Sequence, residues 1–218
     1  MKTMKRFYRL FKTYCPTAVD KLMLLLSAAL TWCLISLGPV ASMFTTSLVM
    51  HVAVQFPLLI ATGWVLGAQA GNTARYKRLN ILLNRNGLPG IFFATFVLAF
   101  WMIPRWIDLS LGSTVIELTK CVSLTVLIGV PLGFSWKRLH PVAVAVVKIE
   151  LLTMLFRLGW IYMVSPDRLC NNYLIGEQYV LGQVFICAGF LIGLVWLVPL
   201  FAGNYKVSLA ESLHADNQ

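Results

Sequence analysis

Charged residues are scarce in this chain, and acidic residues are the scarcest of them. Only 12% of the 218 residues are charged, and Asp and Glu together number eight against eighteen Lys and Arg. A soluble domain carries about 25% charged residues. The composition, which is 59% hydrophobic, therefore excludes an ordinary soluble domain and indicates a protein built for a lipid bilayer.

Motifs that bind metals or haem are also missing. No CxxC or CxxxC pair occurs, so the standard zinc and c-type haem motifs are absent. Only His51 falls inside an apolar run, which leaves neither a bis-histidine haem site nor a carboxylate–histidine cluster. We therefore do not expect an enzyme. An odd number of widely spaced cysteines also argues against a disulfide framework: Cys15, Cys33, Cys121, Cys170 and Cys187.

The apolar residues gather into runs of about 20, the length that crosses a bilayer as a helix. These runs are too long and too evenly apolar for the strands of a barrel, so helices are favoured. The sequence thus predicts an all-α, polytopic transmembrane helix bundle. Its six spans are expected at roughly Lys21–Leu37, Phe44–Leu66, Leu88–Trp106, Val115–Trp136, Pro141–Val164 and Tyr179–Phe201.

Basic residues fall mainly on one side of these spans. They precede the first span, occupy the second and fourth loops and follow the last span, whereas the other side receives mainly Arg105 and Arg168. The positive-inside rule then places both termini in the cytoplasm. The formal charge of +10 reflects this topology, and no nucleic acid is expected as a partner. We expect a multi-pass protein of the bacterial inner membrane, in contact with the lipid bilayer.

The chain divides into three predicted regions. Residues 1–18 form a basic, aromatic segment typical of an amphipathic helix at the cytoplasmic surface. Residues 19–203 form the transmembrane bundle, whose first span lacks a following Ala-x-Ala site and is expected to stay as an anchor. Residues 204–218 form a cytoplasmic tail. Within the bundle, the basic loop Gly71–Gly87 is expected to hold a short surface helix.

Prolines and glycines predict where the helices bend and pack. Pro104 should stop or kink the third span, and Pro131 with Gly133 should kink the fourth. Gly189 and Gly193 form a GxxxG pair, which favours close packing of the last span.

The second span has a polar face, although its sequence between Ser47 and Leu66 is otherwise apolar. Polar side chains are costly in hydrocarbon, so this face should point into the bundle. Helical spacing assigns five residues to it: Ser47, His51, Gln55, Leu58 and Thr62.

Several other polar residues fall in the outer halves of their spans or at the outer ends. A compact bundle would gather them beside His51 in one polar pocket that opens to the periplasm. The expected members of this pocket are Gln55, Asp108, Glu117, Lys120, Glu150, Arg157, Glu177 and Gln178.

Two pairs within this set also have simpler explanations. Glu117 and Lys120 are three residues apart, which fits an intrahelical ion pair with Lys120 extending to the membrane interface. Glu150 and Arg157 share a face of the fifth span, and Glu150 lies near the bilayer middle. Because an unpaired carboxylate is expensive there, we expect Glu150 to be protonated or paired across the bundle.

Four segments occur in a recognisable succession between residues 44 and 195. They are HVAVQFPLL, WMIPRWIDLSL, the fourth span with Ser123 and Gly129, and RLC..Y...EQ..LG. With a Trp-x-x-Pro match at Trp101–Pro104 and an acidic-Gln match at Glu177–Gln178, this succession resembles the CtaG-like family of cytochrome c oxidase assembly membrane proteins. The resemblance implies a role in copper delivery to, or maturation of, a haem–copper oxidase of the caa3 type. It also implies oxidase subunits or a periplasmic copper protein as partners.

The chain departs from this family at its histidines. The family's second histidine of the second span is replaced by Gln55 or Phe56, and its histidine of the fourth span by Lys120 or Cys121. Imidazole and soft sulfur suit copper, whereas an ammonium group is a poor ligand. The candidate Cu(I) ligands are therefore His51, Cys121 and Met50, with Met43 and Met154 as further candidates. The alternative is a pocket that has become a hydrogen-bonded polar core.

Three functions remain open at this point. The first is a membrane-embedded assembly or copper-handling factor for a haem–copper oxidase. The second is a metal-free accessory subunit or scaffold of a respiratory membrane complex. The third is a small transporter with Glu150 and Arg157 on its path.

Overall fold

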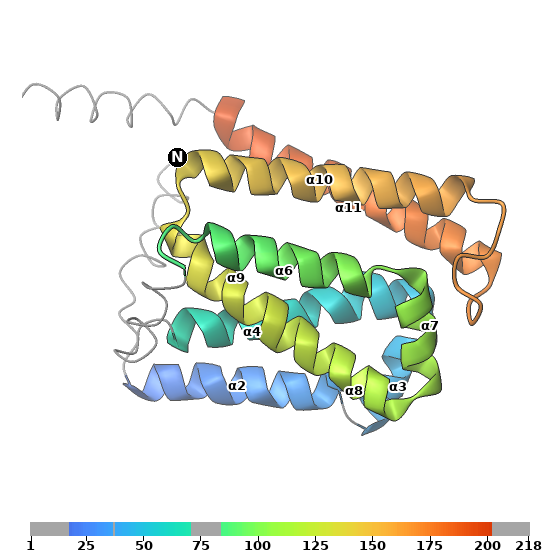
Figure 1. Cartoon of the computed structure of the whole chain (residues 1–218), viewed down its shortest axis with the longest axis horizontal. Helices are drawn as coiled ribbons and strands as arrows, with labels where there is room; N and C mark the ends of the chain where they lie inside the picture. Colours follow the sequence, from blue (N-terminus) through green and yellow to red (C-terminus); the bar gives the residue numbers. More distant parts are fainter. Residues whose placement is uncertain (1–17, 37, 71–83, 202–218) are drawn as a thin grey trace, which may run out of the picture.

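The computed structural model describes residues 18–36, 38–70 and 84–201 (Figure 1). The described part of the chain is helical, with turns and short loops between the helices, and the predicted all-α class is confirmed for it. The predicted basic segment 1–18, apart from its last residue, lies outside the described residues. So do most of the loop Gly71–Gly87 and the tail 204–218. The helical elements are α2 (Ala18–Ser36), α3 (Gly38–Thr45), η1 (Met50–Gln55), α4 (Phe56–Ala70), α6 (Leu88–Trp101), α7 (Pro104–Gly112), α8 (Thr114–Ser123), η2 (Leu124–Gly129), α9 (Val130–Ser135), η3 (Trp136–Arg138), α10 (Pro141–Val164) and α11 (Ile175–Phe201).

The number of spans differs from the predicted six. Within the described residues, three helices are long and apolar enough to cross a membrane: Met50–Ala70, Thr114–Arg138 and Ile175–Val198. A fourth arises if α6 and α7, which meet at a bend of 67°, count as one broken span. The prediction of six was too high because it counted two further helices. The apolar part of α2, Leu22–Ser36, is short, and α10 contains the three charged residues Lys148, Glu150 and Arg157.

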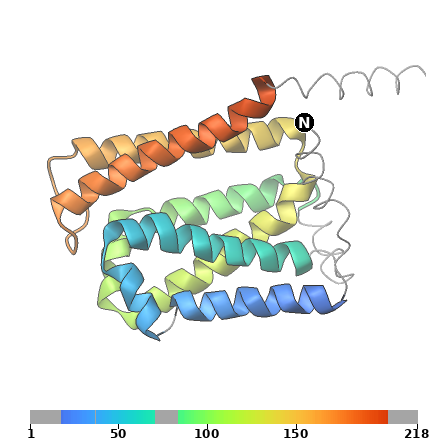
Figure 2. The ribbon, with the colours of Figure 1, turned by 180° about the vertical axis from the view of Figure 1, so that it is seen from behind.

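The helices lie roughly side by side (Figures 1 and 2). Helix α2 lies along one edge and packs on α4, while α10 and α11 form an antiparallel pair at the opposite edge. Between them, α4 packs against η2 and α9, and α6 packs against the same two elements. The loop between α10 and α11 lies at the same end of the helix bundle as α7.

The helices bend where prolines predict it. Helix α6 ends at Trp101 and α7 begins at Pro104, as expected from the lack of an N–H at this proline. At the kink predicted for Pro131, the helix contains a π-helical turn, η2, which ends two residues before the proline. A second π-helical turn, η1, precedes Pro57 in the same way. Each proline leaves a carbonyl of the preceding turn without its usual partner, so the wider turn forms there.

Glycines let the central helices approach closely. Gly63 and Gly67 on α4 form one GxxxG pair, and Gly129 and Gly133 form another on the facing helix. A Cβ added to Gly63 would lie 2.8 Å from the Cα of Gly129, and one on Gly133 would lie 2.8 Å from the backbone nitrogen of Ala68. Backbone therefore meets backbone along this contact.

Glycines also allow close packing between α10 and α11, but the closest approach is not at the predicted pair Gly189–Gly193. Gly159 and Gly182 provide the closest backbone approach, since a Cβ added to Gly182 would lie 2.7 Å from the carbonyl oxygen of Gly159. Of the predicted GxxxG pair, Gly189 packs against the ring of Phe156, while a Cβ on Gly193 would make only ordinary contacts. Close helix packing at Gly189 is thus confirmed.

Candidate functional site: a buried charged cluster

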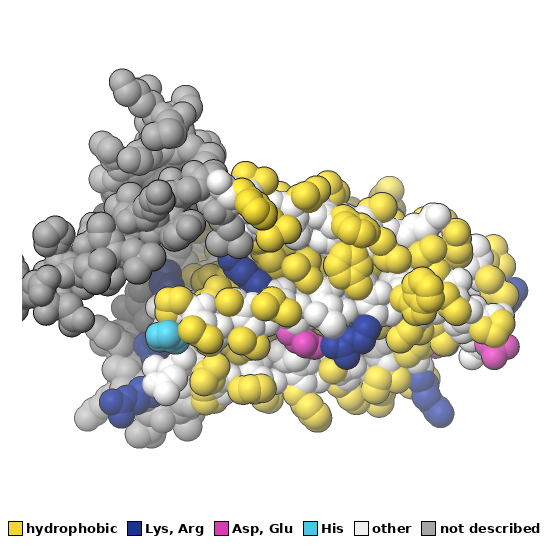
Figure 3. All heavy atoms as spheres, turned by 90° about the horizontal axis from the view of Figure 1, so that it is seen from above, with side chains coloured by type: hydrophobic (Ala, Val, Ile, Leu, Met, Phe, Trp, Pro, Cys, Tyr) yellow, Lys and Arg dark blue, Asp and Glu magenta, His cyan; other side chains and the backbone are white. Residues whose placement is uncertain are grey.

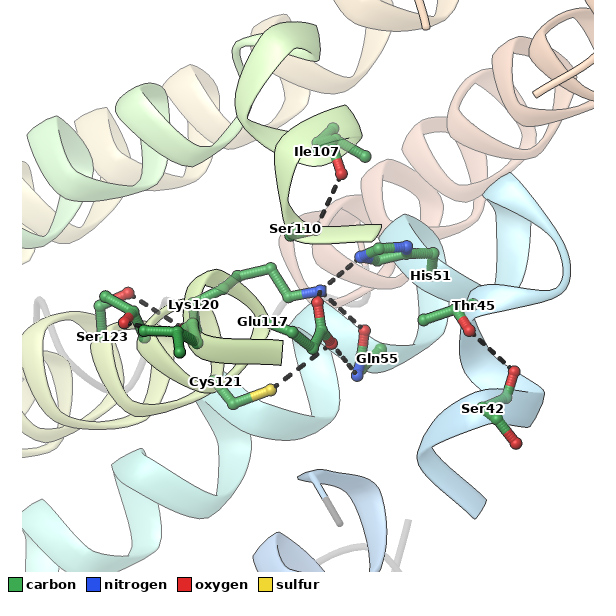
Figure 4. A network of polar contacts seen from close by, with 12 residues as sticks. Ser42, Thr45, His51, Gln55, Ile107, Ser110, Glu117, Lys120, Cys121 and Ser123 are labelled. Carbon is green, nitrogen blue, oxygen red and sulfur yellow. Dashed lines mark hydrogen bonds and ion pairs between the residues drawn. The ribbon is translucent and has the colours of Figure 1, made fainter. Parts of the chain in front are cut away.

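Four of the predicted pocket residues meet in the interior of the bundle, between η1 and α8 (Figure 4). His51 and Gln55 come from η1, and Glu117 and Lys120 come from α8. His51, Gln55 and Lys120 have no exposed surface. We call these four residues the charged cluster. The glycine contact between α4 and η2 brings the two halves of the cluster together. The half on η1 continues into α4, and the half on α8 continues into η2.

The π-helical turn η1 determines which residues face the cluster. Regular α-helical spacing predicts that Leu58 and Thr62 share the face of His51 and Gln55. In the structure Leu58 is exposed, and Leu59, with no exposed surface, takes the inward position. The prediction for Leu58 was wrong because the wider turn shifts the following residues around the helix axis. Thr62 remains buried and donates a hydrogen bond to the carbonyl oxygen of Leu59.

Lys120 occupies the centre of the charged cluster. Its Nζ lies 2.6 Å from Glu117 Oε2 and 3.3 Å from Gln55 Oε1, and it contacts Nε2 of His51. An ammonium group has three hydrogen-bond donors and no acceptor, so it matches this set of acceptors. The intrahelical pair with Glu117 was predicted, but Lys120 does not extend to the interface, since its side chain has no exposed surface.

The remaining contacts hold the acceptors in place. Gln55 Nε2 donates to Glu117 Oε1 over 3.2 Å, which fixes the orientation of the amide that accepts from Lys120. Cys121 Sγ donates to the same carboxylate oxygen over 3.8 Å. The ring of Phe56 lies 5.5 Å from Lys120 Nζ, at a distance suited to a cation–π contact.

His51 is held from its other side by Tyr173, which comes from the loop between α10 and α11. The Tyr173 hydroxyl lies 2.9 Å from His51 Nδ1 and 3.0 Å from the carbonyl oxygen of Thr45. Burial, followed by the carboxylate of Glu177, raises the pKa of Tyr173 above its ordinary value. The phenol is therefore protonated at neutral pH.

The hydrogen-bond donors and acceptors fix the tautomer of His51. A carbonyl oxygen can only accept, so the single phenol proton of Tyr173 goes to Thr45. Nδ1 of His51 must then donate to the phenol oxygen, and Nε2 of the neutral ring accepts from Lys120. Tyr173 and Thr45 were not predicted as members of this site. Nothing in the local sequence indicates that the loop folds back onto η1.

The other predicted pocket residues lie elsewhere. Asp108 on α7 accepts from the backbone N–H groups of Asn171 and Asn172, at 2.8 and 3.3 Å, and so fastens the α10–α11 loop to α7. Gln178 accepts from the N–H of Leu169 over 3.0 Å and donates to the carbonyl oxygen of Tyr162. Both residues order the loop beside the charged cluster without joining it.

Three more predicted residues stay outside the cluster. Glu177 lies in the first turn of α11. Glu150 and Arg157 form an ion pair with each other on α10, 3.4 Å apart, and their side chains are 60% and 66% exposed. Both side chains face outward from α10. The structure thus brings four of the predicted residues together, with Cys121 beside them, and leaves five apart.

The candidate copper ligands do not converge in the described structure. Both nitrogens of His51 already have partners, and the Cys121 thiol points to Glu117. Met50 is 40% exposed on the outside of η1. Within the described residues, no group of three or more His, Cys, Asp or Glu side chains could hold a metal ion. This arrangement does not fit a Cu(I) site.

Neither the scan against protein-family models nor the comparisons with curated proteins and with solved structures finds a match for this chain.

Proposed function

We propose that this chain is a membrane-embedded assembly or accessory factor of a haem–copper oxidase that acts as a scaffold without a metal of its own. The oxidase part of this proposal is supported by the resemblance of residues 44–195 to the CtaG-like family. The metal-free part is supported by the charged cluster.

The observation that carries the proposal is the meeting of His51, Gln55 and Lys120. These three positions are the ones that the resemblance pairs with histidines of the family, with Phe56 and Cys121 as the alternatives. In this chain an ammonium group lies among them and takes up the acceptor atoms that a metal ion would need. This arrangement is what we expect of a diverged relative of the family, in which the pocket keeps its position but its metal ligands have been replaced.

Deletion of the gene in its native bacterium tests the proposal. We expect less assembled haem–copper oxidase, measured from the haem spectrum and the oxygen consumption of isolated membranes. Added copper should not restore the oxidase, whereas the gene in trans should. Full restoration by copper would contradict the metal-free role, and an unaffected oxidase would contradict both oxidase-related functions.

Copper binding can be measured separately on the purified protein. We expect the wild-type chain and a His51→Ala variant to retain the same trace of Cu(I) after competition with a chelator. Retention of one Cu(I) per chain by the wild type alone would contradict a metal-free scaffold and favour copper handling.

We further propose that the protein lies in the bacterial inner membrane with the C-terminal end of α11 on the cytoplasmic side and the α10–α11 loop on the periplasmic side. The support is the distribution of basic residues. A reporter fused after Gln218 should show a cytoplasmic location, and one inserted at Asn171 a periplasmic location. The reverse pattern would overturn this orientation.

A further inference from the structure

Helix α10 presents a charged pair on a surface that has no cover within the described chain. It runs antiparallel along α11, which is long and apolar enough to cross a membrane. Although its three charged residues exclude α10 from the spans found by length and composition, its packing along α11 leads us to place the middle of α10 at the depth of the bilayer core. Figure 3, which views the molecule from the side of α10, shows acidic and basic side chains together in the middle of an apolar surface.

This position is costly for Glu150. It lies nine residues from the first residue of α10 and fourteen from the last, so the nearer end of the helix is about 13 Å away at 1.5 Å per residue. A glutamate side chain cannot span that distance to reach the headgroups. Charged groups at such depth normally face the interior of a bundle or a partner, yet this one is 60% exposed.

Arg157 has unused hydrogen-bonding capacity. Glu150 Oε1, at 3.4 Å, is the one acceptor that the described residues offer to its guanidinium group. A charge-assisted hydrogen bond is normally about 2.7–2.9 Å long, and guanidinium has five N–H donors. Most of these donors therefore await an acceptor from outside the described chain.

Mainly apolar side chains surround the pair. An open groove lies beside Arg157 and is lined by Thr153, Phe156, Trp160, Ile161 and Ile186. Six exposed apolar side chains of α10 recur at helical spacing and form a stripe along the same face. This stripe consists of Val142, Val146, Ile149, Trp160, Ile161 and Val164.

We propose that this face of α10 docks a transmembrane helix of another protein, and that this helix carries one carboxylate side chain at the depth of Arg157. Charge complementarity selects the acidic partner. Arg157 is the basic group of this face, and its single long contact with Glu150 leaves N–H donors whose hydrogen bonds a second carboxylate can accept. Lys148 contacts the ring of Trp196 at 5.2 Å on α11, which leaves Arg157 as the cation that faces the groove.

A second copy of this chain fits the face poorly. Two copies in one membrane have the same orientation, so a two-fold axis along the membrane normal would place each α10 residue opposite its own counterpart. Arg157 would then face Arg157 and Glu150 would face Glu150. This docking face does not depend on the oxidase-related function proposed above.

Fluorescence energy transfer in vesicles tests the docking. The full chain carries the donor dye, and the probe is a leucine-rich transmembrane peptide with one glutamate at mid-length and an acceptor dye. A matched peptide has leucine in place of the glutamate. We expect the glutamate peptide to associate about tenfold more strongly, the preference that an interhelical polar contact of about 1–2 kcal/mol produces.

Three variants locate the contact. Arg157→Leu should remove the preference for the glutamate peptide, while Arg157→Lys, which keeps the charge, should retain it. Lys148→Leu is the matched control, because it removes a charge of α10 that does not line the groove. This variant should also retain the preference for the glutamate peptide. All three should remain monodisperse in detergent because both side chains lie outside the buried core.

Three results would overturn the proposal. The first is equal association of the two peptides with the wild-type chain. The second is an unchanged preference in Arg157→Leu. The third is energy transfer between copies of the chain that falls when Trp160 is replaced by Ala, since a second copy would then cover the face.

Discussion

Gly63 on α4 and Gly129 at the end of η2 lie against each other with no room for a side chain on either. A Cβ added to Gly129 would lie 2.6 Å from the Cα of Gly63. We expect Gly63→Ala and Gly129→Ala each to lower the free energy of unfolding by about 1–3 kcal/mol, the usual cost of overpacking.

Thermal unfolding in detergent measures this loss. Gly193→Ala is the matched control on α11, because its Cβ would meet only Leu152 side-chain atoms at 3.9 Å. If all three variants unfolded at the wild-type temperature, the close backbone contact between α4 and η2 would be disproved.

Lys120 and Glu117 should depend on each other for stability. The Lys120 side chain is fully buried and that of Glu117 is 15% exposed, so replacing either one alone leaves a charge without its partner. We expect Lys120→Met or Glu117→Gln to cost about 3–5 kcal/mol each, and the double variant to cost less than their sum.

Unfolding of the four proteins in this cycle, compared in one detergent, gives the coupling energy. Glu150→Gln on the exposed pair is a useful comparison and should stay close to the wild type. Strict additivity of the Lys120 and Glu117 changes would show that the two side chains do not interact.

The tautomer of His51 is also open to measurement. Nitrogen NMR of chain labelled at histidine, with His51 assigned by its loss in His51→Asn, should show a neutral ring protonated at Nδ1. The expected partners are the phenol oxygen of Tyr173 and the ammonium of Lys120. A Tyr173→Phe variant removes the acceptor at Nδ1 and should change that signal. A ring protonated at Nε2 alone would contradict the hydrogen-bond assignment.

Cys170 should make stability depend on pH in the alkaline range. Burial, with a smaller effect of the Asp108 carboxylate, raises the pKa of Cys170 from 9.0 to about 12. A thiol whose pKa is raised in the folded state stabilises it fully below the unfolded value, and this contribution is lost as pH rises from about 9 to 12.

The difference between wild type and Cys170→Ala isolates this effect from other titrating groups. We expect wild-type stability to fall more steeply than that of the variant above about pH 9. Thiol-specific labelling of Cys170 should also be slow until the protein unfolds, because the residue is 2% exposed. Parallel pH profiles for the two proteins would contradict this prediction.

The sequence indicated some of the polar residues that meet, but not the direction in which each polar residue faces. His51, Gln55, Glu117 and Lys120 were expected in one pocket, and they do meet. Glu150 was expected to be protonated or paired across the bundle, but it faces outward and pairs with Arg157 of its own helix. The position of a residue along a helix does not tell which side of the helix faces the bundle. The π-helical turn η1 adds to this difficulty, because Leu59 takes the inward position expected for Leu58.

Some signals in the sequence could have shown more. Pro57 and Pro131 each lie inside an apolar run, where a distorted turn is to be expected. The pairs Gly63–Gly67 and Gly129–Gly133 are both GxxxG, which indicates the central contact. The role of Tyr173 could not have been predicted, because it depends on how a loop of the α10–α11 pair folds over η1.

The central position of Lys120 has a consequence for the life of the protein in a cell. A metal ion held by the same acceptors would exchange with the surrounding supply and could be removed by a chelator. The cation in this chain is part of the polypeptide, so it is present from synthesis onward and cannot dissociate. This part of the interior therefore has its central cation as soon as the helices have packed.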